Sequence, residues 1–141
     1  MKVLFDTNVV LDILFAREPF YISAARLVEK IVRGEMIGYL CATTITTIYY
    51  LASKSKSIKQ AEHEIQKLLS IFDIAPVNRG VLENALHLKF SDFEDAVIYE
   101  AGFQIGVEAI VSRDKKGFKK STRVPIYEPM ELFKAFDKVI I

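Results

Sequence analysis

The amino-acid sequence predicts an α/β fold, with a central parallel sheet and helices on both of its faces. Short apolar segments of strand length alternate with amphipathic segments of helical period along the chain. Apolar residues make up 51% of the sequence, which suits a sheet that is covered on both sides. The chain has 141 residues and no internal repeat or low-complexity tract, so we expect one domain over residues 1–141.

The predicted elements follow one another at short intervals. Residues 3–5 form an apolar run that ends abruptly at the polar turn Asp6-Thr7-Asn8, as a buried strand does. The threonine-rich segment 43–53 has strand propensity, but we assign it as a helix because the alternation requires a crossover there. Pro125 predicts that the last strand lies at an edge. The remaining elements are strands at 36–42, 72–77, 109–111 and 124–127, and helices at 19–33, 57–70, 79–89, 91–105 and 129–136.

Apolar spacing supports three of these helices. In segment 57–70 we expect Ala61, Ile65, Leu68 and Leu69 to point inward. The other apolar residues at helical spacing are Ile22, Ala25, Val28, Val32 and their neighbours in segment 19–33, and Val81, Leu82, Ala85 and Leu86 on one side of segment 79–89.

Composition excludes several classes of protein. The net charge is only +1, so a nucleic-acid partner would have to be held by a local basic patch. Cys41 is the only cysteine, which excludes a disulfide framework and a zinc cluster. The chain begins without a signal-peptide pattern, and no run approaches the roughly 20 apolar residues of a membrane span. We therefore expect a cytoplasmic protein with no membrane partner.

Two carboxylates directly follow predicted strands. Asp6 ends the strand at 3–5, and Asp114 comes soon after the strand at 109–111. The carboxyl ends of parallel strands share one edge of a sheet, where open α/β sheets bind ligands. If these strands are neighbours, both carboxylates face one crevice, and they repel each other unless a cation lies between them. Oxygen ligands of this kind suit Mg²⁺ or Mn²⁺.

The helix at 91–105 supplies a third acidic group. Ser91-Asp92-Phe93-Glu94 fits a capping box, with Ser91 as the N-cap and Glu94 in a structural role. Asp95 fits a capping role less well. It borders the apolar segment 96–98, where a carboxylate needs a partner such as a metal ion. Asp92 lies on about the same face and is a second candidate ligand.

A basic segment begins beside Asp114. A phosphate backbone that approaches clustered carboxylates requires nearby cations, so we expect this segment to contact nucleic acid. The alternative is a solvated loop. The segment contains Arg113, Lys115, Lys116, Lys119, Lys120 and Arg123, with Phe118 among them.

Three segments resemble the motifs of PIN-domain nucleases. VLFDTNVVLD at 3–12 resembles the opening strand of that family, and DFEDAVIYEAG at 92–102 resembles its acidic helix. IVSRDKKGF at 110–118 resembles its strand that ends in a hydroxyl residue and a carboxylate. The resemblance covers most of the chain. It implies a three-layer α/β/α sandwich and a Mg²⁺- or Mn²⁺-dependent endoribonuclease similar to VapC-type toxins of toxin–antitoxin pairs.

The resemblance also assigns roles to individual residues. It implies RNA as substrate and an antitoxin protein as a partner, and we expect a homodimer. The expected site comprises catalytic and metal-binding Asp6, Asp95 and Asp114, the further metal ligand Asp92, supporting Asn8 and Ser112, and substrate-binding Arg113, Lys115 and Lys116.

Two positions depart from the family pattern. Thr47 stands where the family has a glutamate, and Gly117 stands where a second acid often precedes the phenylalanine. These departures support an alternative function, in which a PIN fold with a weakened site binds RNA or protein. A second alternative is a phosphatase of the haloacid dehalogenase type. That family has an aspartate where this chain has Asn8, and the chain is short for it.

Overall fold

The computed structural model describes residues 1–120 and 123–140, and the side chains up to residue 136. In this part of the chain the strands are β1 (Lys2–Phe5), β2 (Ile37–Cys41), β3 (Asp73–Ala75), β4 (Ala109–Val111) and β5 (Ile126–Tyr127). The helices are α1 (Thr7–Leu14), α2 (Tyr21–Val32), α3 (Ala42–Ser55), α4 (Ile58–Ile71), α5 (Arg79–Leu88), α6 (Phe93–Gln104) and α7 (Pro129–Ile140), with a short 3-10 helix η1 (Lys115–Phe118).

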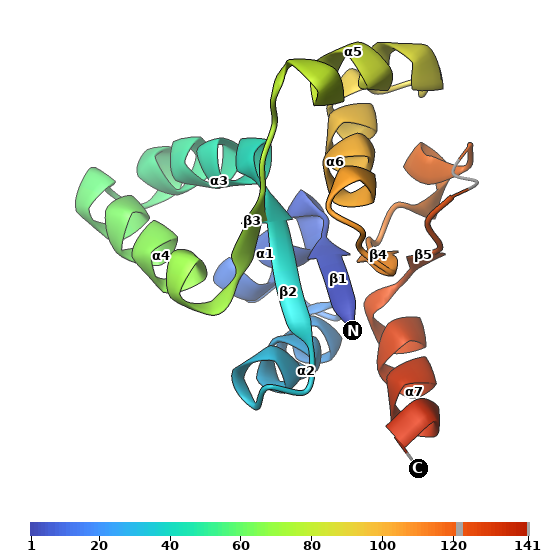
Figure 1. Ribbon diagram of the computed structural model, residues 1–141. Coiled ribbons are helices and arrows are strands. Elements are labelled where there is room, and N and C mark those ends of the chain that lie inside the picture. Colours follow the sequence, from blue (N-terminus) through green and yellow to red (C-terminus); the bar gives the residue numbers. More distant parts are fainter. Residues whose placement is uncertain (121–122, 141) are drawn as a thin grey trace.

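The strands form one parallel sheet in the order β3-β2-β1-β4-β5 (Figure 1). The chain moves outward from β1 to β2 and β3, and then returns to the other side of β1 for β4 and β5. The direction of winding therefore reverses between β1 and β4, where Phe5 is paired with Val111. In open α/β sheets, ligands bind beyond the carboxyl ends of the two strands at such a reversal.

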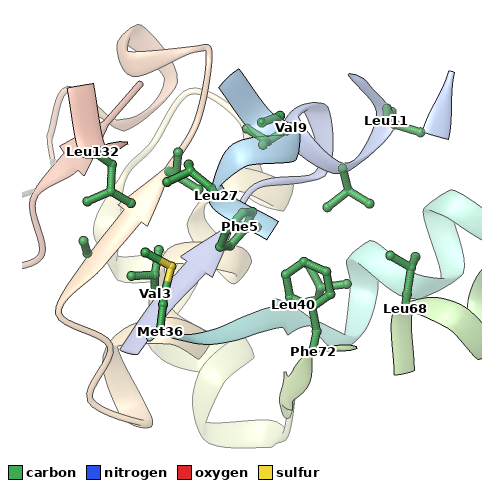
Figure 2. Packing of buried hydrophobic residues seen from close by; sticks show 14 of the residues in the cluster. Val3, Phe5, Val9, Leu11, Leu27, Met36, Leu40, Leu68, Phe72 and Leu132 are labelled. Atoms are coloured by element: carbon green, nitrogen blue, oxygen red, sulfur yellow. The ribbon is translucent and has the colours of Figure 1, made fainter. Parts of the chain in front are cut away.

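Alternation of side chains along β1 divides the core into two layers. Val3 and Phe5 point to one face of the sheet, which α1, α2, α3, α4 and α7 cover, and Figure 2 shows them packed with Leu27 and Leu40. Leu4 points to the other face, which α5, α6 and η1 cover. The predicted three-layer α/β/α sandwich is thereby confirmed.

Segment 43–53 is helical, as the alternation predicted. α3 begins directly after β2 and buries Ile48 and Ala52, which lie four residues apart on one face. Packing of this face outweighs the strand propensity of the threonine-rich sequence. The predicted edge strand is also confirmed, because β5 pairs only with β4 in the described sheet.

One helix was not predicted, and another ends later than predicted. The polar turn after β1 is the first turn of α1, which begins at Thr7, because the Asp6 carboxylate accepts the N–H of Thr7 and caps the helix. α7 continues to Ile140, beyond the predicted end at Phe136. None of the described helices is both long and apolar enough to cross a membrane.

The inward face predicted for segment 57–70 is wrong at one residue, because Leu69 of α4 is exposed. The apolar residues of two other helices are also only partly covered. α2 buries Ala24 and Leu27 but exposes Ile22 and Val32, and α5 exposes Leu82 and Leu86. The apolar stripe of each helix is wider than the surface that its neighbours cover, so spacing alone did not select the covered edge.

Gly38→Ala should destabilise the fold, because the central strand β2 has no room for a side chain there. An added Cβ would collide with Ile31 Cδ1 and would lie 2.9 Å from Phe72 Cδ1. Overpacking of this kind costs about 1–3 kcal/mol of the free energy of unfolding. Urea denaturation followed by circular dichroism measures this loss.

Gly80→Ala is the matched control. It lies in the first turn of α5, where an added Cβ would meet only Asn78 Oδ1, at 3.5 Å. Alanine favours helix over glycine, so this variant should be neutral or more stable. Equal stability of the two variants would show that the Gly38 contact does not limit packing.

Candidate functional site

Asp6 lies between the end of β1 and the start of α1, beside the end of β4. Its backbone N–H donates to Val111 O at 2.9 Å, which extends the β1–β4 pairing by one residue. Its carboxylate is only 5% exposed. Oδ1 accepts the N–H of Thr7 at 2.8 Å, and Oδ2 accepts the hydroxyl of Ser112 at 2.7 Å. The strand ends predicted to share a crevice are therefore adjacent.

The Ser112 hydroxyl connects the two strand ends. It is fully buried, and besides donating to Asp6 it accepts the N–H of Asp114 at 3.0 Å. Asn8 Nδ2 lies 3.5 Å from the same oxygen, and Asn8 Oδ1 accepts the N–H of Arg113 at 3.3 Å. The turn at 112–114 is thus fixed to the first turn of α1. The structure therefore brings the predicted supporting residues Asn8 and Ser112 together with Asp6 and Asp114.

Gly117 shows how Asp95 of α6 joins this group. An added Cβ on Gly117 would lie 2.7 Å from Asp95 Oδ2 and 3.2 Å from Asp114 Oδ2. The Gly117 N–H also donates to Asp114 Oδ1 at 3.3 Å. Glycine leaves the space that these two carboxylates occupy. A side chain at position 117 would require these carboxylates to shift.

The predicted capping box on α6 is wrong. The N-cap is Asp92, whose Oδ1 accepts the N–H groups of Glu94 at 2.8 Å and Asp95 at 3.4 Å. The helix therefore begins at Phe93, two residues later than predicted. Aspartate and serine cap helices equally well, so local sequence did not distinguish Ser91 from Asp92. The Glu94 side chain is exposed and takes no part in the cap, whereas the Asp92 carboxylate is occupied by the capping hydrogen bonds.

The carboxylates act on one another electrostatically. Burial raises the pKa of Asp95 to about 7, and the negative charges of Asp6, Asp92, Asp114 and Glu94 add to the rise. Burial also raises the pKa of Asp6, against the hydrogen bonds from Ser112 and Thr7, with Asp114 and Glu94 contributing to the rise. A cation placed among these groups would relieve the repulsion.

The oxygen donors of this site suit a hard divalent cation. No three carboxylate, imidazole or thiol groups in residues 1–120 and 123–140 converge on one point where an ion could be held. Mg²⁺ usually takes one or two carboxylates and completes its coordination with water and phosphate oxygens. Two of the three carboxylates of Asp6, Asp95 and Asp114 are therefore enough to bind one ion. The raised pKa values of Asp6 and Asp95 fit such a site, because a bound cation would stabilise the ionised carboxylates.

Asp12 is a buried acid that the sequence analysis did not single out. It is completely buried in α1 and accepts two hydrogen bonds from Arg113, from Nε at 2.5 Å and from Nη2 at 3.1 Å. The Arg113 guanidinium also lies over the Phe20 ring, 4.0 Å from its centre. Arg113 was expected to bind substrate, but its charge is paired within the protein. The signal in the sequence was an acid among the apolar residues of segment 9–14.

Two other cations of the basic segment are also paired. Lys115 Nζ lies 3.0 Å from Glu131 Oε1. Arg123 Nη2 lies 2.9 Å from Oε2 of Glu100, a second buried acid that the sequence analysis missed, within the apolar part of α6. Lys116 and Lys119 are exposed, and neither side chain makes an ion pair or hydrogen bond with a described residue.

α3 contributes no carboxylate to the site. Its sequence contains no acid, and Thr47 is half-buried within it. The start of α3 is joined to the start of α1 by the hydroxyls of Thr7 and Thr44, whose oxygens lie 2.8 Å apart. Thr44 is fully buried. The carboxylates of the site therefore come from the ends of β1 and β4 and from α6.

Comparison with known proteins agrees with this geometry. A family model described as the PIN domain matches residues 2–116. The chain is 27% identical over 128 residues to Ribonuclease VapC1 of Aquifex aeolicus (strain VF5), and the match covers 87% of this chain and 88% of that protein.

Solved structures share the fold. A chain of VapBC2 from Rickettsia felis, bound to a DNA fragment from their promoter, has a TM-score of 0.69 and 15% identity, over 91% of this chain and 98% of that one. A chain of a toxin-antitoxin complex from Klebsiella pneumoniae has a TM-score of 0.67 and 20% identity, over 90% and 97%.

Asp95→Asn should change how stability depends on pH in EDTA. The pKa of Asp95 rises from 3.8 to about 7 on folding. The native chain therefore holds a proton between these values that the unfolded chain has lost, and stability falls as pH rises through this range. The variant has no carboxyl group at position 95 and does not lose stability in this way. The melting temperature of the variant minus that of the wild type should therefore increase from pH 5 to pH 8.

Glu94→Gln provides a graded comparison. Its charge contributes to the raised pKa of Asp95, so removing it should shift the pH-dependent loss of stability to lower pH. Thermal denaturation at a series of pH values measures both variants. A difference between Asp95→Asn and wild type that does not vary with pH would contradict the raised pKa of Asp95.

Asp12→Asn should destabilise the fold by about 3 kcal/mol. The substitution keeps the shape of the buried side chain but leaves Arg113 without its counter-charge. Because the Arg113 side chain is 27% exposed, partial hydration places the loss at the lower end of the range for broken buried ion pairs. Urea denaturation of Asp12→Asn and of the exposed control Asp73→Asn measures the effect. Equal stabilities would mean that the Asp12–Arg113 pair contributes nothing.

Proposed function

This chain belongs to the PIN domain family, and on that premise we propose that it is a divalent-metal-dependent ribonuclease that hydrolyses phosphodiester bonds within RNA. One observation carries the proposal: carboxylates from the ends of β1 and β4 and from α6 gather where the sheet reverses its winding, and burial together with their charges raises the pKa of Asp95 to about 7. The similarity to a protein named Ribonuclease VapC1 supports RNA as the substrate class.

In this proposal Asp6, Asp95 and Asp114 would hold Mg²⁺ or Mn²⁺, with Asp92 as a further candidate that must first leave its capping bond. The ion supplies Lewis-acid polarisation of the phosphate and neutralises the gathered negative charge. Ser112 keeps the Asp6 carboxylate in one orientation through its hydrogen bond.

The raised pKa of Asp95 gives this residue a second capability. A carboxyl group with a pKa near 7 can accept or release a proton at neutral pH, as a general acid or base requires. A bound metal ion would offset the negative charge of the neighbouring carboxylates, which favours protonation of Asp95. We therefore propose that Asp95 is a metal ligand when the cation is present, and that it exchanges a proton near neutral pH when the cation is absent.

The proposed partners follow from the family. We propose RNA as substrate and an antitoxin protein as a regulator, because the structures of similar fold include VapBC2 of Rickettsia felis and a toxin-antitoxin complex of Klebsiella pneumoniae. A homodimer is also proposed. Co-expression with the product of any adjacent small gene, followed by size-exclusion chromatography, tests the partner and the oligomeric state together.

The alternative is a PIN fold that binds RNA or protein without efficient cleavage. It is favoured by the absence of an acid in α3, where Thr47 takes the place of the family's glutamate. Single-turnover cleavage in Mn²⁺ separates the two functions. If the missing acid limits the reaction, Thr47→Glu should accelerate cleavage, whereas a binding module would cleave no faster than background in either form.

Asp6→Asn should abolish divalent-dependent cleavage and leave the fold intact. Asparagine keeps the shape of the side chain but removes the charge that holds the cation, so we expect a loss of roughly 100-fold or more in rate. The melting temperature in EDTA should not fall, because one of several neighbouring negative charges is removed. Cleavage of a fluorogenic RNA with increasing Mn²⁺ measures the rate.

Glu62→Gln, on the exposed surface of α4, is the matched control and should cleave like wild type. Full activity of Asp6→Asn in Mg²⁺ and Mn²⁺ would remove Asp6 from the proposed site.

A further inference from the structure

A small cavity lies beside Gly117, the residue next to the carboxylates of Asp95 and Asp114. Its volume is about 180 Å³, and two segments far apart in the sequence line it. The connection between α5 and α6 contributes Lys89, Phe90 and Ser91, and the region around η1 contributes Lys116, Lys119 and Lys120 beside Gly117. Four of these residues are lysines, and none of the described residues that line the cavity is acidic. We call it the lysine pocket.

None of the four lysines is paired with an acid among the described residues. Lys89, Lys116 and Lys119 are exposed, and their side chains make no ion pair or hydrogen bond with a described residue. The fourth, Lys120, donates to Lys89 O at 2.7 Å and ties the two segments together. The other cations of the basic segment are already neutralised by Asp12, Glu131 and Glu100. Local positive charge is therefore concentrated at the pocket.

The walls of the pocket are held in place. The Phe90 ring packs against Tyr99 and Phe118, at centroid distances of 5.4 and 6.0 Å. Lys89 ends α5 in the left-handed conformation, with φ 59° and ψ 33°, and so turns the chain into the pocket wall. Because Asp92 caps α6, the Ser91 hydroxyl is left as a donor at the rim.

We propose that the lysine pocket binds a phosphate of the RNA strand next to the phosphate that is cleaved. This inference rests on the proposed ribonuclease function. An added Cβ on Gly117 would lie 2.7 Å from Asp95 Oδ2 and 3.2 Å from Asp114 Oδ2, and Gly117 also lines the pocket, so the two sites share this residue as a neighbour. The carboxylates repel a phosphate backbone, and the neighbouring lysines supply the attraction that brings it in. Lysine contacts to phosphate position a strand without selecting its sequence.

The salt dependence of RNA binding tests the pocket. The variant is Lys89→Asn with Lys116→Gln and Lys119→Gln, since asparagine accepts the left-handed conformation at position 89. The matched control is Lys59→Gln, Lys67→Gln and Lys134→Gln, which removes the same charge from exposed positions on α4 and α7. Both are placed in Asp6→Asn protein, and binding of a labelled single-stranded RNA is measured in Ca²⁺ by fluorescence anisotropy.

One phosphate held by three lysines predicts a specific slope. The slope of log affinity against log salt concentration is negative, and its magnitude should decrease by roughly 0.7 in the pocket variant and stay unchanged in the control. An unchanged slope in the pocket variant overturns the proposal, and so does an equal fall in both variants. A fall of about 2 also overturns it, because each lysine would then contact a separate phosphate.

An inorganic anion separates this inference from the proposed function. Pyrophosphate should raise the melting temperature of the wild type and of the control variant, and the pocket variant should lose this stabilisation. If the wild type binds no RNA yet shows this pattern, the ribonuclease function fails while the anion site stands. If pyrophosphate does not stabilise the wild type, or stabilises the pocket variant equally, the lysine pocket is overturned whatever the RNA result.

Discussion

The hydrogen bond from the Ser112 hydroxyl to the buried carboxylate of Asp6 joins segments that are 106 residues apart. It can form only because β1 and β4 are parallel neighbours, with Phe5 opposite Val111 in the last paired row. The same hydroxyl fixes the N–H of Asp114 and contacts Asn8. Two strand ends, one helix start and a turn are thus held to a single oxygen, and the acidic site exists where the sheet reverses its winding.

The fold places the carboxylates of the site close to one another, and it neutralises other buried acids with arginine side chains. Asp6 and Asp95 have raised pKa values because they are buried near other carboxylates, and neither forms an ion pair with a described residue. Asp12 and Glu100 are more deeply buried, yet each has an arginine partner. Unpaired acids at the strand ends and paired acids elsewhere distinguish the site from the scaffold, since structural carboxylates are normally neutralised by a partner.

The basic segment after Asp114 has two uses. Its arginines and Lys115 neutralise acids of α1, α6 and α7, which anchors the segment to both layers of helices. Its remaining lysines meet Lys89 across the pocket beside Gly117. Gly117 lines this pocket, and its lack of a side chain leaves room for the carboxylates of Asp95 and Asp114.

Local patterns in the sequence determined the kind of sheet, the helical state of segment 43–53 and the placement of Asp6, Asn8, Ser112 and Asp114 at one edge, because periodicity and strand ends are properties of short segments. Tertiary structure alone decided which edge of each apolar stripe is covered, that Asp92 rather than Ser91 caps α6, and which acids neutralise Arg113, Lys115 and Arg123. It also brought Lys89 to the other lysines. These outcomes depend on contacts between residues up to about 100 positions apart, which a local pattern does not encode.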